Sequence, residues 1–206
     1  MKTRSWKWSE IFAVILPIVF GILSVFQAHA SMTIIVSTNS DTVADDGLCS
    51  LREAIAAANT DTPSGLSIGE CPAGSGSDTI TIPAMEIPLG SRLVINSPIV
   101  LAGVGMGSTV IKGGGVFSVN AGHVTFRGLT VQGSTSPGAS GGNGITVLAG
   151  TVEISDARIT GNSLTGGGGG LYVASLMSHC SLAIPQTGLV VSGTAPLESL
   201  SCATRH

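Results

Sequence analysis

An internal repeat constrains the fold of this chain more than any other feature of its sequence. Residues 119–133 align without gaps on residues 147–161, which gives a period of 28 residues. A looser copy lies about 25 residues upstream, with Ile95 followed by Ile99 and Leu101. Each copy alternates apolar and polar residues, turns at glycine and alternates again, a pattern typical of short β-strands. The chain therefore repeats one strand-turn-strand unit.

This repeat favours a solenoid over a β-sandwich, the other fold that short strands between frequent turns can build. A sandwich has no reason to repeat its strands at a fixed period, whereas a solenoid stacks equivalent positions of successive coils into one core. We expect an all-β fold, a parallel β-helix of about three to four coils over residues 91–173. Its interior should hold Val124, Phe126, Val131, Val152, Ile154 and Ile159.

A short helix is predicted to begin at Leu51, ahead of the repeats. Ser50 and Glu53 have the spacing of a capping box, in which each side chain bonds the backbone N–H of the other residue. The apolar residues that follow share one narrow stripe, at Leu51, Ala54, Ile55 and Ala58. Pro63 and Gly65 then stop the run. The helix should bury this stripe against the end of the solenoid.

The residues around this helix resemble a known family. Residues 49–55 read Cys-Ser-Leu-Arg-Glu-Ala-Ile, with Asp-Asp-Gly at 45–47 before them and Gly-Glu-Cys-Pro at 69–72 after them. The segment is similar to the CSLREA-type N-terminal domain of bacterial extracellular proteins with a pectin lyase-like fold. The resemblance implies a right-handed parallel β-helix, an N-terminal helical cap segment over residues 31–90 and an extracellular address. It implies no single chemistry.

A weaker similarity links the glycine-rich turns to the repeats of polymorphic outer-membrane proteins. The sequences Gly-Gly-Asn-Gly-Ile at 141–145 and Gly-Gly-Gly-Leu at 168–171 are similar to their GGA-Ile/Leu/Val repeat. Ile159 to Asn162 is similar to their Phe-x-x-Asn, with isoleucine in place of phenylalanine.

Residues 1–30 have the layout of a cleavable signal peptide. Basic residues precede a mostly apolar run over residues 11–26, and Ala28 and Ala30 occupy the two positions that a signal peptidase reads. The run contains Pro17 and is shorter than the about 20 residues of an uncleaved membrane anchor. We expect cleavage after Ala30, so that the mature chain starts at Ser31 without a transmembrane segment. It would be secreted or held at the cell surface.

The composition of the mature chain excludes several classes of partner. Three basic residues and Glu10 leave with the signal peptide, which changes the net charge from −3 to about −5. Nucleic acid is excluded as a partner, because its binding depends on basic patches. Both tryptophans also leave, and the remaining aromatic residues are Phe117, Phe126 and Tyr172. Extracellular polysaccharide or a host or neighbouring cell surface remains as the expected partner.

Four cysteines in an exported chain favour disulfides over free thiols. We predict that Cys49 pairs with Cys71, because both lie in the family-like segment and bracket a loop rich in Thr, Pro, Ser and Gly. The alternative, a metal pair, lacks CxxC spacing and a nearby histidine. The pairing of Cys180 and Cys202 stays open.

The densest group of carboxylates in the chain suggests a possible Ca²⁺ site near the N-terminus. This group comprises Asp41, Asp45, Asp46 and Glu53. An EF-hand loop ending at Glu53 would need ligands at Thr42 and Ala44, which carry no carboxylate. We therefore expect turn and cap roles for these acids, and predict no cofactor.

The repeats offer little for catalysis, since Glu153 and Asp156 are their only acids. Glycoside hydrolysis needs two carboxylates about 5 to 9 Å apart, and a lyase needs a Ca²⁺-binding acid cluster with a Lys or Arg base. We expect Glu153 to point outward and Asp156 to lie in a turn beside Arg158. No catalytic residue is predicted.

The sequence thus favours a structural or adhesive surface protein. The alternative is a polysaccharide-acting enzyme, a lyase or glycoside hydrolase, with its active site in missing coils; a carbohydrate-binding solenoid is a third hypothesis. Residues 174–206 break the repeat, and we expect an irregular tail that is either a divergent cap or the truncated or out-of-frame end of a longer product.

Overall fold

The protein is a β-solenoid of parallel strands with one helix, as the computed structural model describes it for residues 31–113, 115–133, 144–162, 170–173, 182–183 and 190–192. The helix is α2 (Leu51–Thr60). The predicted signal peptide with Ala28 and Ala30, and the cysteines Cys180 and Cys202, lie outside the described residues.

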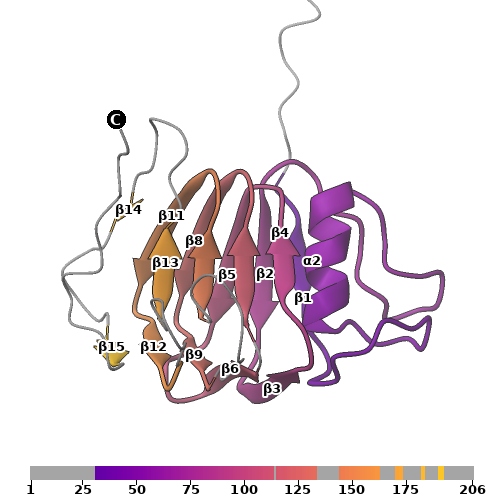
Figure 1. The fold of residues 1–206 in the computed structure, drawn as a ribbon. Coiled ribbons are helices and arrows are strands. Elements are labelled where there is room, and N and C mark those ends of the chain that lie inside the picture. The colour runs from indigo at the N-terminus through magenta and orange to yellow at the C-terminus, as the bar shows by residue number, and fades with distance from the viewer. Residues whose placement is uncertain are drawn as a thin grey trace, which may run out of the picture.

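Three parallel sheets form the walls of the solenoid (Figure 1). Sheet A has the order β1 (Thr33–Ile35), β2 (Asp78–Ile82), β5 (Ile99–Gly103), β8 (His123–Arg127), β11 (Thr151–Ser155) and β14 (Leu182–Ala183). Sheet B has β3 (Met85–Leu89), β6 (Thr109–Gly113), β9 (Thr130–Gln132), β12 (Arg158–Thr160) and β15 (Val190–Ser192). Sheet C has β4 (Leu93–Ile95), β7 (Phe117–Val119), β10 (Ile145–Val147) and β13 (Leu171–Val173). From β2 onward the chain visits sheets A, B and C in turn.

The strand register confirms the period read from the sequence. Val147 pairs with Val119, and Val152 pairs with Val124, each 28 residues apart. One coil earlier, Ile99 pairs with Val124 at an offset of 25 residues, as the looser copy predicts. The sequence repeat therefore corresponds to one coil of the stack.

The core is a column of apolar side chains inside the three sheets. All six residues predicted to point inward are buried, at Val124, Phe126, Val131, Val152, Ile154 and Ile159. Two aromatic rings pack against each other within it, with the ring centroids of Phe117 and Phe126 5.1 Å apart. Alternation along each short strand produces this column, because successive side chains point to opposite faces of a sheet.

Glycine permits the close stacking of successive corners. Gly122 and Gly150 occupy equivalent positions and both have positive φ, +84° and +88°. A Cβ added to Gly150 would lie 2.3 Å from the backbone oxygen of Gly122. A larger residue would therefore push the coils apart as well as strain the backbone.

The stacked strands extend beyond the limits expected from the repeat. β2 and β3 lie within residues 31–90, which the sequence assigned to a cap segment, because their coil precedes the recognisable copies. At the other end, β14 and β15 pair in parallel with β11 and β12, although the sequence predicts an irregular tail after residue 173. The rest of that tail lies outside the described residues.

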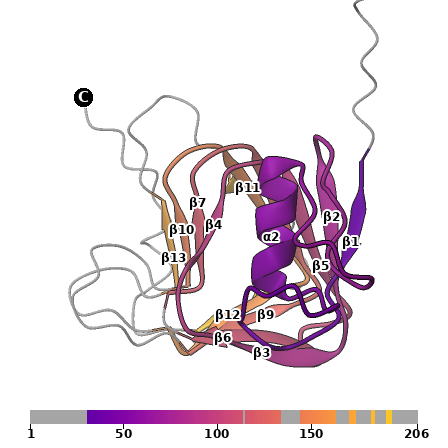
Figure 2. The ribbon, with the colours of Figure 1, turned by 90° about the vertical axis from the view of Figure 1, so that its right-hand side faces the viewer.

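Helix α2 lies at the end of the stack against β2 and β4 (Figure 1). Seen along the stacking direction, it crosses the interior that the three sheets outline (Figure 2). Its apolar stripe is buried as predicted, at Leu51, Ala54, Ile55 and Ala58, and joins the solenoid core.

Candidate functional site

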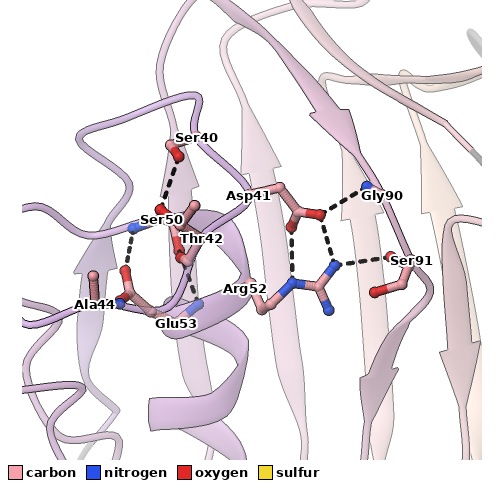
Figure 3. A network of polar contacts seen from close by, with 9 residues as sticks. All are labelled: Ser40, Asp41, Thr42, Ala44, Ser50, Arg52, Glu53, Gly90 and Ser91. Carbon is pink, nitrogen blue, oxygen red and sulfur yellow. Dashed lines mark hydrogen bonds and ion pairs between the residues drawn. The ribbon is translucent and has the colours of Figure 1, made fainter.

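The start of α2 carries the predicted capping box (Figure 3). The Ser50 hydroxyl accepts from the Glu53 backbone N–H at 3.2 Å, and the Glu53 carboxylate accepts from the Ser50 N–H at 2.9 Å. Glu53 is 3% exposed, and its second oxygen accepts from the Ala44 N–H at 2.8 Å. The Ser50 hydroxyl also donates to the Thr42 carbonyl. The cap thus fixes residues 42–44 on the helix as well as its first turn.

A second contact joins α2 to the first coil through Arg52, whose side chain lies off the apolar stripe. Its guanidinium donates to both oxygens of Asp41, at 2.8 and 2.9 Å, and to the Ser91 carbonyl at 2.9 Å. Asp41 also accepts from the Gly90 N–H at 2.8 Å (Figure 3). One carboxylate and one guanidinium therefore hold three segments together: the helix, the turn before it and the β3–β4 corner.

The other end of α2 is tied to sheet C by Asn59. Its amide nitrogen donates to the Val94 carbonyl at 2.8 Å, and its amide oxygen accepts from the Asn96 N–H at 2.8 Å. The Ser97 hydroxyl adds a bond to the Ala58 carbonyl, one of the last carbonyls of the helix. Polar contacts thus fix both ends of α2 to the coil below.

The disulfide between Cys49 and Cys71 is present, as predicted. The two residues are buried, and their Cα atoms lie 4.8 Å apart across a sequence separation of 22. In the chain-entropy model a loop of this length contributes about 3 kcal/mol by restricting the unfolded chain. The bridge holds the loop after α2 against the residues before it.

Two carboxylates, those of Glu70 and Asp45, hold the loop after α2 through hydrogen bonds. Glu70 accepts from the Asp46 N–H at 2.9 Å, from the Gly47 N–H at 2.8 Å and from the Ser64 hydroxyl. The Ser64 bond, with the Gly47 N–H, lowers the pKa of Glu70 below its ordinary value. Asp45 accepts from the Ser67 N–H at 2.8 Å, and hydrogen bonds from Ser67 lower its pKa.

Of the acids that the sequence placed in turns and caps, Asp45 and Asp46 lie in a bend and Glu53 closes the helix cap, whereas Asp41 forms an ion pair. Asp41 binds Arg52, Asp45 binds the Ser67 N–H, and Asp46 accepts from the Leu48 N–H at 3.0 Å. Within the described residues no group of three or more His, Cys, Asp or Glu side chains gathers to hold a metal ion.

The outer faces of the coils carry small polar contacts. The Nε2 atom of His123 lies 3.7 Å from Glu153, and its Nδ1 atom lies 2.6 Å from the Thr151 hydroxyl. The His123 and Glu153 side chains are 59% and 38% exposed. A hydroxyl, an imidazole and a carboxylate in sequence could transfer a proton, but the 3.7 Å gap exceeds hydrogen-bond length. The arrangement fits an exposed contact between coils.

Asp156 lies in a turn, as expected, for a conformational reason. Its φ is +47°, and the equivalent residue one coil earlier is Gly128, with φ +64°. Aspartate tolerates this left-handed conformation better than most residues. Its neighbour Arg158 forms no ion pair with it among the salt bridges of the described residues.

The burial of Asp78, a carboxylate at the start of β2 that is fully buried, was not predicted from the sequence. A signal was present, because Asp78 has the same alternation phase as Ile80 and Ile82, which point into the core. A charged residue at an inward position indicates a specific polar environment.

Comparison with known proteins assigns this chain to no family. No family model, curated protein or solved structure matches the chain. Among the described residues no helix is long and apolar enough to cross a membrane. The fold therefore defines the class of protein, a parallel β-solenoid with a disulfide beside its helix.

Proposed function

We propose that this chain is an exported protein, secreted or held at the cell surface, with a structural or adhesive role and no catalysis of its own. The observation that carries the proposal is the buried Cys49–Cys71 bridge beside α2. Disulfides persist in oxidising compartments and are rare in the cytosol. The signal-like residues 1–30 supply a route to such a compartment.

In this proposal the fold is a right-handed parallel β-helix of the CSLREA type, and α2 is its N-terminal cap. Right-handed crossovers are the general rule for parallel strands. A solenoid needs a cap because its first coil otherwise exposes apolar interior to water. The buried stripe of α2 and its bonds to residues 90–97 support this role.

The outer surface, rather than an enclosed site, would make contact with a partner. The polar side chains that point outward on β8 and β11 are small or singly charged, and their interactions run between adjacent coils. Such a regular face suits an extended polymer or another cell surface. The proposed partner is extracellular polysaccharide or the surface of a host or neighbouring cell.

Binding and turnover assays on the exported protein test this function. We expect beads coated with the purified protein to retain polysaccharide or neighbouring cells above the level of albumin-coated beads. We expect no reducing ends and no unsaturated uronate from pectin, alginate or glycosaminoglycan, with or without Ca²⁺.

An enzyme whose acids lie in this chain, rather than in missing coils, predicts product formation in the same assay. Glu153→Gln and Asp156→Asn are the diagnostic variants, because these are the acids of the repeats. Product that disappears in either variant would replace the structural proposal by the enzymatic one. Failure of the beads to retain any polysaccharide or cells would remove the adhesive role.

A further inference from the structure

Asp78 is a buried carboxylate whose hydrogen bonding is incomplete. Its Oδ1 atom accepts from the Ser75 N–H at 2.8 Å and from the Met32 N–H at 3.3 Å. Its Oδ2 atom is buried and has no hydrogen-bond partner in the described part of the chain. A buried charge is costly unless an opposite charge or full hydrogen bonding compensates it. Asp78 thus lacks a compensating group.

In the described part of the chain no cationic side chain forms an ion pair with Asp78. A Cβ added to Gly74 would lie 2.5 Å from Oδ2 and 2.8 Å from the Ala58 Cα, so this side is closed by packed backbone. On the neighbouring strand β5, Asp78 pairs with Ile99. None of these neighbours is titratable, and the salt bridges of the described residues involve other carboxylates. The last turn of α2, which contains Ala58, adds the negative end of a helix dipole.

The Oδ1 side of the Asp78 carboxylate lies beside the start of β1, where the Met32 N–H donates to it. Thr33 pairs with Thr79, and the Thr79 N–H donates to the Met32 carbonyl at 2.8 Å. This register places Met32 beside Asp78, with Ser31 next along the chain. Both Ser31 and Met32 are exposed. Consecutive Cα atoms are about 3.8 Å apart, so the nitrogen of Ser31 lies within a few ångströms of the Met32 N–H that binds Asp78.

We propose that cleavage of the signal peptide creates the missing counter-charge: the α-ammonium of Ser31 pairs with the carboxylate of Asp78. Water adds across the Ala30–Ser31 peptide bond, Ala30 leaves as a carboxylate and the freed Ser31 amine takes up a proton. In the precursor the same nitrogen is an uncharged amide. This inference rests on the proposed export, because it requires cleavage at that bond.

The pair would make the final stability of the fold depend on processing. Among the described strands of sheet A, β1 lies at the edge and pairs with β2. An ion pair at its first residues holds that edge, and only the processed chain has it. The precursor would keep a weaker N-terminal edge until export is complete.

The pKa of the Ser31 α-amine tests the proposal directly. The processed protein is recovered after export, and its amines are labelled by reductive ¹³C-methylation, which preserves their charge. Lys112 is the one lysine of residues 31–206, so the spectrum should show two sites, with the lysine as internal reference. Titration of the folded protein should place the α-amine pKa at least about one unit above its ordinary 7.7–8.0.

Two comparisons identify the cause of the shift. In Asp78→Asn the α-amine should return to its ordinary range, because asparagine keeps the Oδ1 acceptor and removes the charge. If that variant does not fold, the urea-unfolded wild-type protein gives the reference value. Equal α-amine pKa values in folded and unfolded wild-type protein would overturn the ion pair while leaving export intact.

Intact mass separates this failure from that of the proposed export. A recovered protein that retains residues 1–30 has no amine at Ser31, which would overturn both proposals together. A mass that begins at Ser31 with an ordinary α-amine pKa would overturn the ion pair alone.

Discussion

Arg52 and Asp41 form a two-pronged ion pair across the junction between helix α2 and the first coil. The guanidinium Nε and Nη2 atoms lie 2.8 and 2.9 Å from the two carboxylate oxygens, and the pair also binds the backbone at Gly90 and Ser91. The two side chains are 22% and 16% exposed. Paired charges of this kind, partly shielded from water and bonded to backbone, hold an interface more strongly than exposed pairs.

The first prediction concerns this pair. Arg52→Ala should lower the free energy of unfolding by about 1–3 kcal/mol, because the hydrogen bonds are to charged groups. Arg52→Lys should recover only part of it, since lysine keeps the charge but not the planar fork. Urea unfolding followed by circular dichroism measures both. The control is Lys112→Ala, which removes the exposed pair with Glu86 and should change stability by less than about 1 kcal/mol. Equal effects of the two alanine variants would contradict the role of Arg52.

The helix start gives a second prediction. Ser50→Ala should destabilise the protein by roughly 0.5–2 kcal/mol, because it removes the N-cap acceptor. Leu51→Ala and Ile55→Ala should each cost about 2–5 kcal/mol, since both side chains are buried in the core. Thr60→Ser is the control on an exposed position of the same helix, because it keeps the hydroxyl that bonds the Ala56 carbonyl and Thr62, and its expected change is within about 0.5 kcal/mol. If Ser50→Ala, Leu51→Ala and Ile55→Ala all unfold like the wild type, α2 does not close the solenoid.

Removal of the disulfide gives the third prediction. In a Cys180→Ala/Cys202→Ala background, adding Cys49→Ala and Cys71→Ala should lower stability by about 3 kcal/mol. Reductant should destabilise the background protein by a similar amount and leave the fourfold variant unchanged. An unchanged denaturation midpoint of the background protein in reductant would show that the bridge contributes nothing.

The fourth prediction concerns the decline in the free energy of unfolding at acidic pH. The pKa of Glu70 is lowered in the folded protein, mainly by the Ser64 hydroxyl and the Gly47 N–H. A lowered carboxylate pKa stabilises the fold above the unfolded value, near 4.5, and this stabilisation is lost as the pH falls through the folded value. Glu70→Gln should therefore flatten the decline in stability below about pH 4.5, as measured by urea unfolding from pH 6 to pH 2. Glu86→Gln removes an exposed carboxylate elsewhere and serves as the charge-matched control. If the free energy of unfolding declines identically with falling pH in the wild type and in Glu70→Gln, Glu70 does not contribute to the decline.

The repeat made the coil region predictable from the sequence. Val119 and Val147 pair as aligned because each coil is built from the same alternating unit, so one register fixes the next. The capping box at Ser50 and Glu53 was also readable, since its partners are three residues apart and need no tertiary information.

Contacts between distant segments were not readable in this way. The bonds of Glu70 to Asp46 and Gly47 span 24 and 23 residues, and the bond between Asn59 and Val94 spans 35. No local pattern specifies such pairs. The repeat did not predict β2 and β3, because the sequence of their coil has diverged from the later copies. In β2, Asp78 occupies a position where an apolar residue would have indicated a strand.

We propose that this chain is exported and that its solenoid carries an oxidised disulfide. The most direct test is mass spectrometry of peptides from the exported protein, digested without reductant. We predict an N-terminal peptide that begins at Ser31 and a linked pair of peptides that joins Cys49 to Cys71. An N-terminal peptide from within residues 1–30, or free thiols at both Cys49 and Cys71, would contradict the account.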